Sequence, residues 1–288
     1  MAHFPRNRQC YPPAAGASNR SGRERGFYAE GMPLIGILPS VPVARLLSHV
    51  LDFCYPAACA HCNETCLTDS FLCDSCGAKL QKLADAPRCM KCAMPLVTDG
   101  APCPYCLGRG LSPINQIVRL GVFNSPLKDL IHQLKYHRRW TLAESLADEL
   151  AKLDSVQGLI KRESVLVPVP LHILRHVSRG YNQSEIIARR LRRHFRCHLA
   201  QPVRRIRNTI TQTHIHARAE REANMRGAFA LKSTSQLTDR NVIIVDDVMT
   251  TGSTLRAFAR TLKTAQPASI SAVTIAVADP KHQDFQGI

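Results

Sequence analysis

Residues 241–255 read NVIIVDDVMTTGSTL. The four β-branched residues at 242–245 predict a strand that is buried on both faces. Asp246 and Asp247 come next, and a loop of threonines, one glycine and one serine leads into the apolar helical spacing of residues 254–264. Ligands of open α/β sheets bind at the carboxyl ends of the strands. The stretch therefore predicts a binding site built from this acid pair and this loop.

The loop has the composition of a phosphate site. Backbone N–H groups at a helix start bind anions, hydroxyl groups add further donors, and Gly252 lets a ligand approach closely. The two carboxylates suit the neighbouring hydroxyls of a sugar, or a magnesium ion. Loop and acids together match a ribose 5-phosphate, with its phosphate in the loop and its hydroxyls on the acids.

Three other interpretations fit less well. A Walker A loop needs a lysine before its Ser or Thr, and this loop has none. A receiver domain carries its acid pair near its start, whereas only 41 residues follow Asp247. Solvated acids at a strand end would account for both aspartates but not for five consecutive loop residues, Thr250, Thr251, Gly252, Ser253 and Thr254.

The chain after residue 114 alternates apolar strands with amphipathic helices, which predicts an α/β fold with a parallel sheet and helices on both faces. In the helix expected at 125–137, Ser125 is the expected N-cap and Pro126 the first helical residue. The other elements are expected at 116–123 (strand), 142–153 (helix), 164–170 (strand), 184–195 (helix) and 269–278 (strand).

Ten of the 12 cysteines lie between Cys54 and Cys106, and eight of them form two copies of one pattern. Each copy has two C-x2-C pairs separated by ten residues, and the second copy follows the first at a distance of 30 residues. Two such pairs supply the four thiolates that zinc prefers, so two structural zinc ions per chain are expected, rather than the disulfides of a secreted protein. Sequential ligation is expected, with an interleaved cross-brace as the alternative: Cys59, Cys62, Cys73 and Cys76 for one ion, and Cys89, Cys92, Cys103 and Cys106 for the other.

The 288 residues carry a formal charge of +16, which favours acidic partners such as nucleotides or nucleic acid. Residues 159–226 alone hold 14 Arg and one Lys against four Glu. The expected domains are a disordered basic tail at 1–40, a helix with a double zinc ribbon at 41–110, the α/β domain at 114–280 and a short tail at 281–288. Met32 is an alternative start to Met1. No apolar run reaches the length of a membrane span, and we expect a cytoplasmic protein.

Residues 242–255, VIIVDDVMTTGSTL, resemble the phosphoribosyl-pyrophosphate (PRPP) motif of type I phosphoribosyltransferases. Further blocks are similar, in the same order, to those of the ComF family of competence-related proteins: LDFCYPAACAHC (51–62), VPVPLH (167–172), RGYNQSE (179–185) and RIRNTITQTHIHARAEREANMRGAF (205–229). The double zinc ribbon agrees with this resemblance, which covers about residues 41–278. It implies a type I phosphoribosyltransferase-like fold preceded by the ribbon.

The resemblance also implies roles for individual residues. Asp246 and Asp247 would hold the ribose hydroxyls of PRPP and, with Arg207 and Arg221 of a mobile hood, would form the catalytic group. Magnesium would accompany PRPP, and arginine forks would stabilise the departing pyrophosphate. The remaining PRPP contacts would come from Val248, Met249, Thr250, Thr251, Gly252, Ser253 and Thr254 in the phosphate loop, Pro168 and Val169 in the pyrophosphate loop, and Arg179, Gln183 and Gln212.

Two hypotheses for function follow. The first is a PRPP-binding phosphoribosyltransferase-like protein of DNA uptake, natural transformation or DNA utilisation. The second is a non-catalytic zinc-containing module that binds single-stranded DNA or a partner, such as a competence helicase or another DNA-uptake protein, and keeps a vestigial or sensory PRPP site. Under the second hypothesis, the arginines on one expected helix would bind a nucleic-acid backbone. Solvated surface charge is the simpler interpretation of these residues: Arg189, Arg190, Arg192, Arg193 and Arg196.

Overall fold

A computed structural model of the chain describes residues 58–66, 70–171, 180–206 and 227–278. All of them belong to the larger of two compact units, His49–Ile288. The expected basic tail at 1–40, the helix expected before the first cysteine pair and the tail at 281–288 lie outside the described residues. Within these limits, no helix is both long and apolar enough to cross a membrane.

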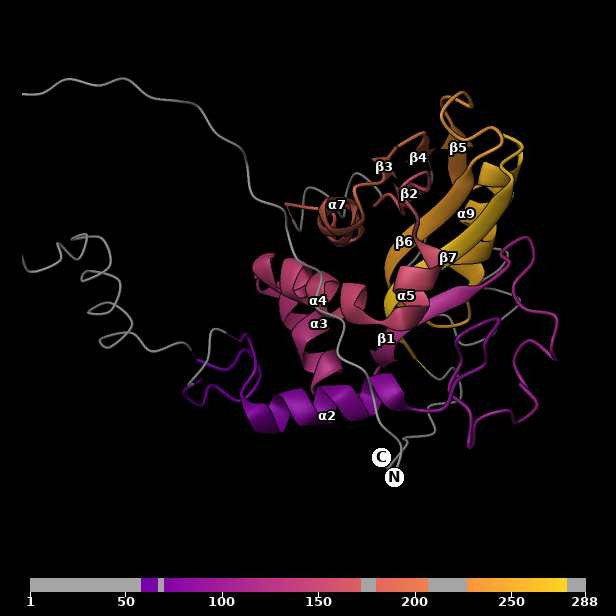
Figure 1. The fold of residues 1–288 in the computed structure, drawn as a ribbon. Coiled ribbons are helices and arrows are strands. Elements are labelled where there is room, and N and C mark those ends of the chain that lie inside the picture. Colours follow the sequence, from indigo (N-terminus) through magenta and orange to yellow (C-terminus); the bar gives the residue numbers. More distant parts are fainter. Residues whose placement is uncertain (1–57, 67–69, 172–179, 207–226, 279–288) are drawn as a thin grey trace, which may run out of the picture. The chain divides into compact units, whose positions relative to one another are not determined.

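The centre of this unit is a five-stranded sheet in which all neighbouring strands are parallel (Figure 1). Its order is β1-β7-β6-β2-β3. Parallel sheets are covered on both faces, which is why their strands are apolar without alternation. The strands are β1 (Ile117–Val122), β7 (Ser269–Val277), β6 (Asn241–Met249), β2 (Val165–Pro168) and β3 (His198–Leu199).

Helices cover one face of the sheet, where Leu130, Leu146 and Ile187 pack in the same core as Ile243 and Val245. In sequence order, the helices on this side are α2 (Asp74–Asp85), α3 (Leu127–Tyr136), α4 (Thr141–Lys152), α5 (Asp154–Leu159) and α7 (Gln183–Phe195). The alternation of strands and helices predicted from the sequence is confirmed.

The opposite face is covered by α9 (Ser253–Lys263), whose Phe258 and Leu262 share a core with Val242 and Ile244. Beside α9 lie two short antiparallel strands, β4 (Val203–Arg205) and β5 (Phe229–Leu231). The rings of Phe229 and Phe258 meet edge to face at 5.0 Å. The prediction of helices on both faces of a parallel sheet is therefore confirmed.

The two cysteine repeats pack on opposite faces of the sheet. Cys59 and Leu72 of the first belong to the core beneath α3 and α4, whereas Cys89 and Met94 of the second belong to the core beneath α9. Helix α2 connects the repeats and packs on the edge strand β1. A methyl group at Gly121 of β1 would lie 3.2 Å from Leu83 Cβ of α2, so glycine permits this close approach. The repeats thus hold the edge strand between them.

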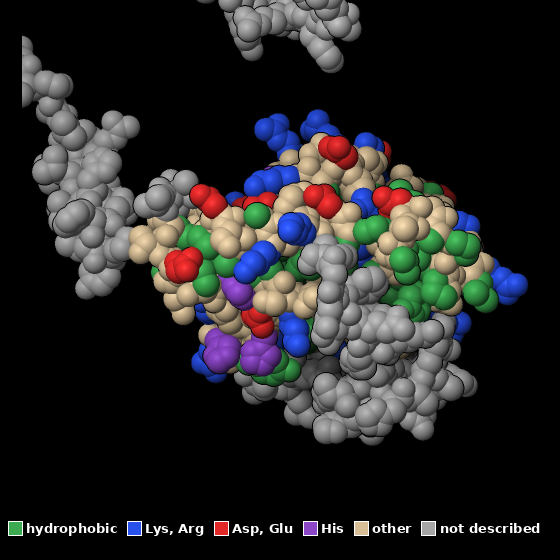
Figure 2. Space-filling model, turned by 90° about the horizontal axis from the view of Figure 1, so that it is seen from below, with side chains coloured by type: hydrophobic (Ala, Val, Ile, Leu, Met, Phe, Trp, Pro, Cys, Tyr) green, Lys and Arg blue, Asp and Glu red, His purple; other side chains and the backbone are tan. Residues whose placement is uncertain are grey.

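The second repeat also exposes an apolar surface. Met90, Val97 and Leu107 are among the few large apolar side chains that the described residues expose to solvent. On the face drawn in Figure 2, hydrophobic side chains gather toward the right, the side on which Figure 1 draws this repeat. Exposed apolar patches of this kind often mark interaction surfaces.

Two local predictions need correction. Pro126, not Ser125, occupies the N-cap position of α3, and the Ser125 hydroxyl instead donates to Asp129 Oδ2 at 2.7 Å. The Ser125 side chain therefore binds a carboxylate of the first turn, and no side-chain cap is formed at the start of α3. Strand β6 was expected to end at the acids, but it continues to Met249. Asp246 lies opposite Thr274 of β7, so the pairing with β7 holds the acids in place.

Candidate functional site

The acid pair of β6 is held by two helices, α7 and α3, and by the backbone of β6 itself. Asp246 Oδ1 accepts hydrogen bonds from the Ser184 hydroxyl of α7 (3.1 Å) and from the backbone N–H of Asp247 (2.9 Å). Asp247 Oδ2 forms an ion pair with Lys135 Nζ of α3 at 3.0 Å. The side chains of Lys135 and Asp247 are 20% and 14% exposed, so this pair is largely removed from bulk water.

The Asp246 carboxyl keeps its proton to a higher pH than an ordinary carboxyl. Burial raises the pKa of Asp246, and the neighbouring Asp247 charge raises it further. The N–H of Asp247, the Lys135 ammonium and the Ser184 hydroxyl act in the other direction, and the pKa of Asp246 comes to about 7. Near neutral pH Asp246 is therefore partly protonated, while Asp247 forms the ion pair with Lys135. The pair can both accept and donate hydrogen bonds.

The predicted phosphate loop is short and enclosed. Between β6 and α9 only residues 250–252 are outside regular structure, and Thr251, Gly252 and Ser253 are all buried. The Thr251 hydroxyl donates to Ser253 Oγ at 3.2 Å. Val248 and Met249, predicted as loop residues, lie in β6, and the Met249 side chain is in the core. They can contribute to the site only through their backbone atoms or by placing the loop that follows them.

Gly252 is required at the start of α9 for two reasons. Its φ of +73° lies in the left-handed region, which disfavours residues with a Cβ atom. A methyl group there would also lie 2.4 Å from Cδ1 of Leu111, a residue that follows the second cysteine repeat. The loop is therefore shaped partly by the packing of this repeat on the same face of the sheet.

We expect Gly252→Ala to destabilise the protein by about 2 kcal/mol, from about 1 kcal/mol of backbone strain plus the cost of moving Leu111. Chemical denaturation measures the change. In a Leu111→Ala background the clash is absent, so the same substitution should cost about 1 kcal/mol less. Equal costs in both backgrounds would show that Leu111 does not constrain the loop.

Side chains of the RGYNQSE block join the start of α7 to the other parts of the site. Asn182 caps α7 by accepting from the Ser184 N–H, and its Nδ2 donates to the Val169 carbonyl at 3.0 Å. Tyr181 donates to the carbonyl of Leu134 in α3. Pro168 pairs with Val245, so the predicted pyrophosphate loop begins beside the acid pair.

The structure brings only some of the predicted contact residues together. Pro168, Val169 and the buried Gln183 lie at the same carboxyl edge of the sheet as the acid pair and the loop. The others lie outside the described residues: Arg179, Arg207, Gln212 and Arg221. Sequence reasoning gave no role to Lys135 or Ser184, because it cannot tell which helix residues reach a distant strand. The sequence signal that could have indicated Lys135 was its place directly after the last buried position of α3.

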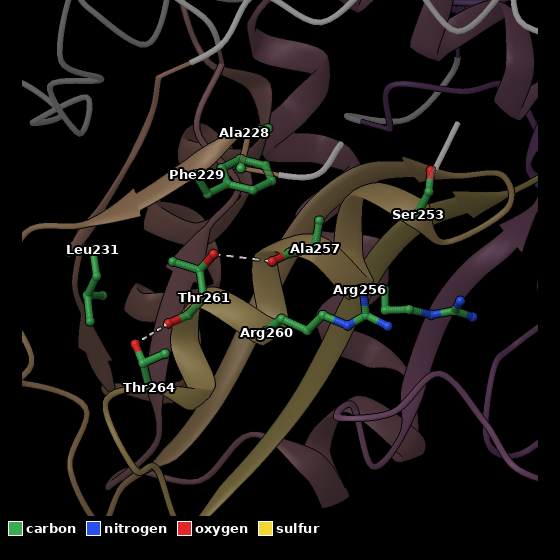
Figure 3. Close-up of a pocket in the computed structure, with 10 residues that line it drawn as sticks. Ala228, Phe229, Leu231, Ser253, Arg256, Ala257, Arg260, Thr261 and Thr264 are labelled. Atoms are coloured by element: carbon green, nitrogen blue, oxygen red, sulfur yellow. Dashed lines mark hydrogen bonds between the residues drawn. The ribbon is translucent and has the colours of Figure 1, made fainter. Parts of the chain in front are cut away.

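A cavity of about 380 Å³ runs along α9, starting from Ser253. Figure 3 shows Phe229 and Leu231 on one side and Arg256 and Arg260, one turn apart, on the helix. The helix hydroxyls of this cavity are already used, since Thr261 donates to the Ala257 carbonyl and Thr264 to the Thr261 carbonyl. The acid pair does not line this cavity, which is therefore separate from the predicted sugar site.

The eight repeat cysteines form two tetrads with the sequential composition. In each tetrad the four sulfur atoms lie within 4.8 Å of one another. The Cys92–Cys103 and Cys89–Cys106 sulfurs are 3.6 Å and 3.7 Å apart. Four sulfurs around a zinc ion at about 2.3 Å would be about 3.8 Å apart, whereas a disulfide needs about 2.0 Å. The geometry fits zinc and excludes both the disulfides and the interleaved cross-brace.

The surroundings of the tetrads also suit zinc thiolates. Burial alone would raise the pKa of Cys59, but N–H groups of Cys62, Cys73 and His61 lower it to about 6, which favours the thiolate that binds metal. Arg119 of β1 is fully buried, donates to the Ala86 carbonyl at 2.9 Å and has two nitrogens without a hydrogen-bond partner. Burial lowers the pKa of Arg119 and the neighbouring Cys92 charge raises it, so this buried cation lies close to the second tetrad, which carries net negative charge when it holds zinc.

Comparisons with known proteins agree with both halves of the fold. A model of the phosphoribosyl transferase domain matches residues 140–285, and a model of the double zinc ribbon domain matches residues 50–107. A hypoxanthine phosphoribosyltransferase structure from Staphylococcus aureus aligns over 50% of this chain and 65% of its own, at 16% identity and a TM-score of 0.29. That superposition is too loose to inform the site. Fold and sequence define a phosphoribosyltransferase-like protein with an N-terminal double zinc ribbon.

Two curated relatives identify the family within this class of proteins. The "DNA utilization protein YhgH" of Escherichia coli K12 is 34% identical over 209 residues, which is 71% of this chain and 83% of that protein. "Competence protein F" of Haemophilus influenzae Rd is 31% identical over 211 residues, 71% of this chain and 90% of its own length. The chain belongs to the ComF family, which confirms the resemblance seen in the sequence.

Proposed function

We propose that the site at the end of β6 binds PRPP and that the protein acts in DNA uptake or DNA utilisation. The observation that supports PRPP most is the continuity of strand, acid pair, three-residue loop and helix start on one segment. The names of the two relatives support the DNA-related role. We also propose that the protein acts in the cytoplasm.

The proposed binding mode assigns one part of the ligand to each part of the site. The ribose hydroxyls would contact Asp246 and Asp247, and the 5-phosphate would contact the N–H groups and hydroxyls of residues 250–254. The pyrophosphate would lie toward Val169. Asp247 is paired with Lys135, so the acid pair is a poor site for magnesium; the ion would instead arrive on the pyrophosphate, whose charge it would help to neutralise.

Calorimetry with PRPP tests this proposal. The double variant Asp246→Ala/Asp247→Ala should bind PRPP about 100-fold more weakly than wild type, because two charge-assisted hydrogen-bonding groups are lost. Asp99→Ala, an exposed acid of the second ribbon, should bind as wild type does. If the double variant kept full affinity, PRPP would not bind at this pair. Release of pyrophosphate from PRPP with any nucleobase would add transfer activity to binding.

The alternative, a module that binds DNA or a protein partner without catalysis, is favoured by a different observation. Three large apolar residues of the second ribbon, Met90, Val97 and Leu107, are exposed, and Met90 and Leu107 line a cavity of about 570 Å³. Such a surface suits a protein partner more than a nucleic-acid backbone, and a competence helicase is one candidate. Pairing of this chain with that helicase, lost in Leu107→Glu but not in Asp246→Ala/Asp247→Ala, would support this alternative.

The basic helix α7 is less suited to DNA than its composition indicates. Arg190 forms a two-point contact with Asp148 at 2.6 and 2.8 Å, and Arg189 pairs with Glu185 of the same helix. His194 also contacts Asp148. Cations neutralised by neighbouring acids add little to phosphate binding. DNA binding that depends on salt, ignores PRPP and survives loss of the acid pair would nevertheless favour a nucleic-acid-binding module.

A further inference from the structure

Lys135 is held beside the acid pair by its neighbours in α3. The next residue toward the N-terminus, Leu134, accepts a hydrogen bond from the Tyr181 hydroxyl at its carbonyl. One residue earlier, Gln133 Nε2 donates to the Ala60 carbonyl of the first ribbon at 2.9 Å. The last turn of α3 is therefore fixed from two sides, and the Lys135 ammonium meets Asp247 Oδ2 at 3.0 Å in a largely enclosed position.

This arrangement opposes the binding of a divalent cation at the acid pair. Magnesium needs near-octahedral oxygen ligands at about 2.1 Å and usually takes one or two of them from carboxylates. At Asp247 it would lie beside the Lys135 ammonium, which already contacts Oδ2 and repels a second cation. At Asp246, Oδ1 already accepts two hydrogen bonds, and burial, which raises the pKa of this carboxyl, disfavours its charged form. Neither acid offers a free pair of charged oxygens.

The same arrangement suits neutral hydroxyl groups. A lysine ammonium has three N–H donors, and Asp247 uses one of them. The remaining donors can reach a ligand oxygen, while the second oxygen of Asp247 accepts a hydroxyl proton. Each of two adjacent sugar hydroxyls can donate one hydrogen bond and accept others. The two hydroxyls therefore match the donors of Lys135 and the acceptor oxygen of Asp247 without any added charge.

We propose that Lys135 takes the place of a metal ion at the acid pair, so that this end of the site binds the neighbouring hydroxyls of a pentose without a divalent cation. Lys135 is then a ligand-contacting residue, not a structural ion pair alone. This inference rests on the proposed function for the identity of the sugar. The exclusion of a metal ion from the acid pair concerns the free protein and does not depend on which sugar binds.

The first test uses the zinc-loaded full chain and ribose 5-phosphate, which lacks the pyrophosphate that would carry magnesium. We expect wild type to bind it equally, within about twofold, with EDTA-treated buffer and with added Mg²⁺. In metal-free buffer Lys135→Met should bind about tenfold more weakly, as expected for the loss of a charged hydrogen-bond donor, and Mg²⁺ should restore much of that loss. Lys128→Met, an exposed lysine two turns earlier in α3, is the matched control.

The second test uses Mn²⁺ alone and needs no sugar. Electron paramagnetic resonance should detect one more Mn²⁺ bound per chain in Lys135→Met than in wild type, and Asp247→Asn added to that variant should remove it. If wild type already binds Mn²⁺ in a way that depends on Asp247, or if Lys135→Met gains no Mn²⁺ site, the inference is wrong. Failure of wild type to bind ribose 5-phosphate would instead count against the proposed function, and the Mn²⁺ result would still decide the role of Lys135.

Discussion

Cys92→Ser is expected to reduce the zinc content from two ions per chain to about one and to destabilise the fold by on the order of 5 kcal/mol or more, because binding of a structural zinc ion contributes about 10 kcal/mol or more to folding. Cys92 is 1% exposed and shares its core with residues of the sheet. Loss of its zinc ion would therefore loosen the sheet as well as the ribbon. Elemental analysis and thermal unfolding measure the two effects.

Cys66→Ser is the matched control for this experiment. Cys66 is also buried in the ribbon region, but it belongs to neither tetrad. It should keep two zinc ions and lose only about 1–2 kcal/mol, as for a small buried group replaced by a more polar one. If Cys92→Ser kept both zinc ions, or if Cys66→Ser lost one, the assignment of ligands would be wrong.

The effect of zinc loss should extend to the candidate site. The Cδ1 atom of Leu111, which follows the second tetrad, lies 2.4 Å from the position that a Cβ atom on Gly252 would take, and Gly252 is the N-cap of α9. His61 lies beside the first tetrad, with its Nδ1 atom 3.3 Å from Cys76 Sγ. Its Nε2 atom lies 3.2 Å from Asp129 Oδ2 of α3, the helix that carries Lys135. Each ribbon thus contacts one of the elements that shape the site.

Much of this fold could be predicted because its signals are local. The apolar runs of β6 and β7 and the amphipathic spacing of α4 and α7 follow from burial on one or both sides. The zinc ligands could be paired because C-x2-C spacing places two sulfurs on one turn. The loop between β6 and α9 could be located because its residues are consecutive; its role in phosphate binding stays a prediction.

The remaining features depend on contacts between distant parts of the chain. The pairing of Lys135 with Asp247 joins residues 112 positions apart, and Ser184 reaches Asp246 from a third element. No local pattern specifies such contacts. The extension of β6 to Met249 depends on its pairing with β7, since Asp246 would not otherwise favour a strand. Contacts between distant segments therefore determine both the environment of the acid pair and the length of β6.

Asp246→Asn is expected to stabilise the protein at neutral and alkaline pH while weakening the binding of ribose 5-phosphate. The fold raises the pKa of Asp246 from 3.8 to about 7, mainly through burial. Below about pH 4 the folded and unfolded states both hold the proton, so the group has no effect on stability. Between pH 4 and 7 only the unfolded state releases it, so wild type loses stability as the pH rises, and the full loss is reached above pH 7.

Asparagine carries no charge and can still accept the hydrogen bonds of Ser184 and the Asp247 N–H. The stability gained by Asp246→Asn should therefore grow from pH 5.5 to about 7 and stay constant to pH 8.5. A rise of the pKa from 3.8 to about 7 corresponds to about 4 kcal/mol, so a gain of about 2–4 kcal/mol is expected. Urea unfolding at fixed ionic strength measures it, and the zinc sites common to both proteins cancel in the difference.

Asp148→Asn is the control with the opposite sign. Burial alone would raise the pKa of Asp148, but hydrogen bonds from Arg190 and His194 lower it below its usual value, so its charge stabilises the fold. Asparagine there should destabilise the protein at neutral pH. A stability gain at Asp246 that did not change with pH, or that was larger in acid, would contradict a raised pKa. A gain that grows with pH and accompanies weaker binding would show that the acid pair is maintained for its ligand at the expense of stability.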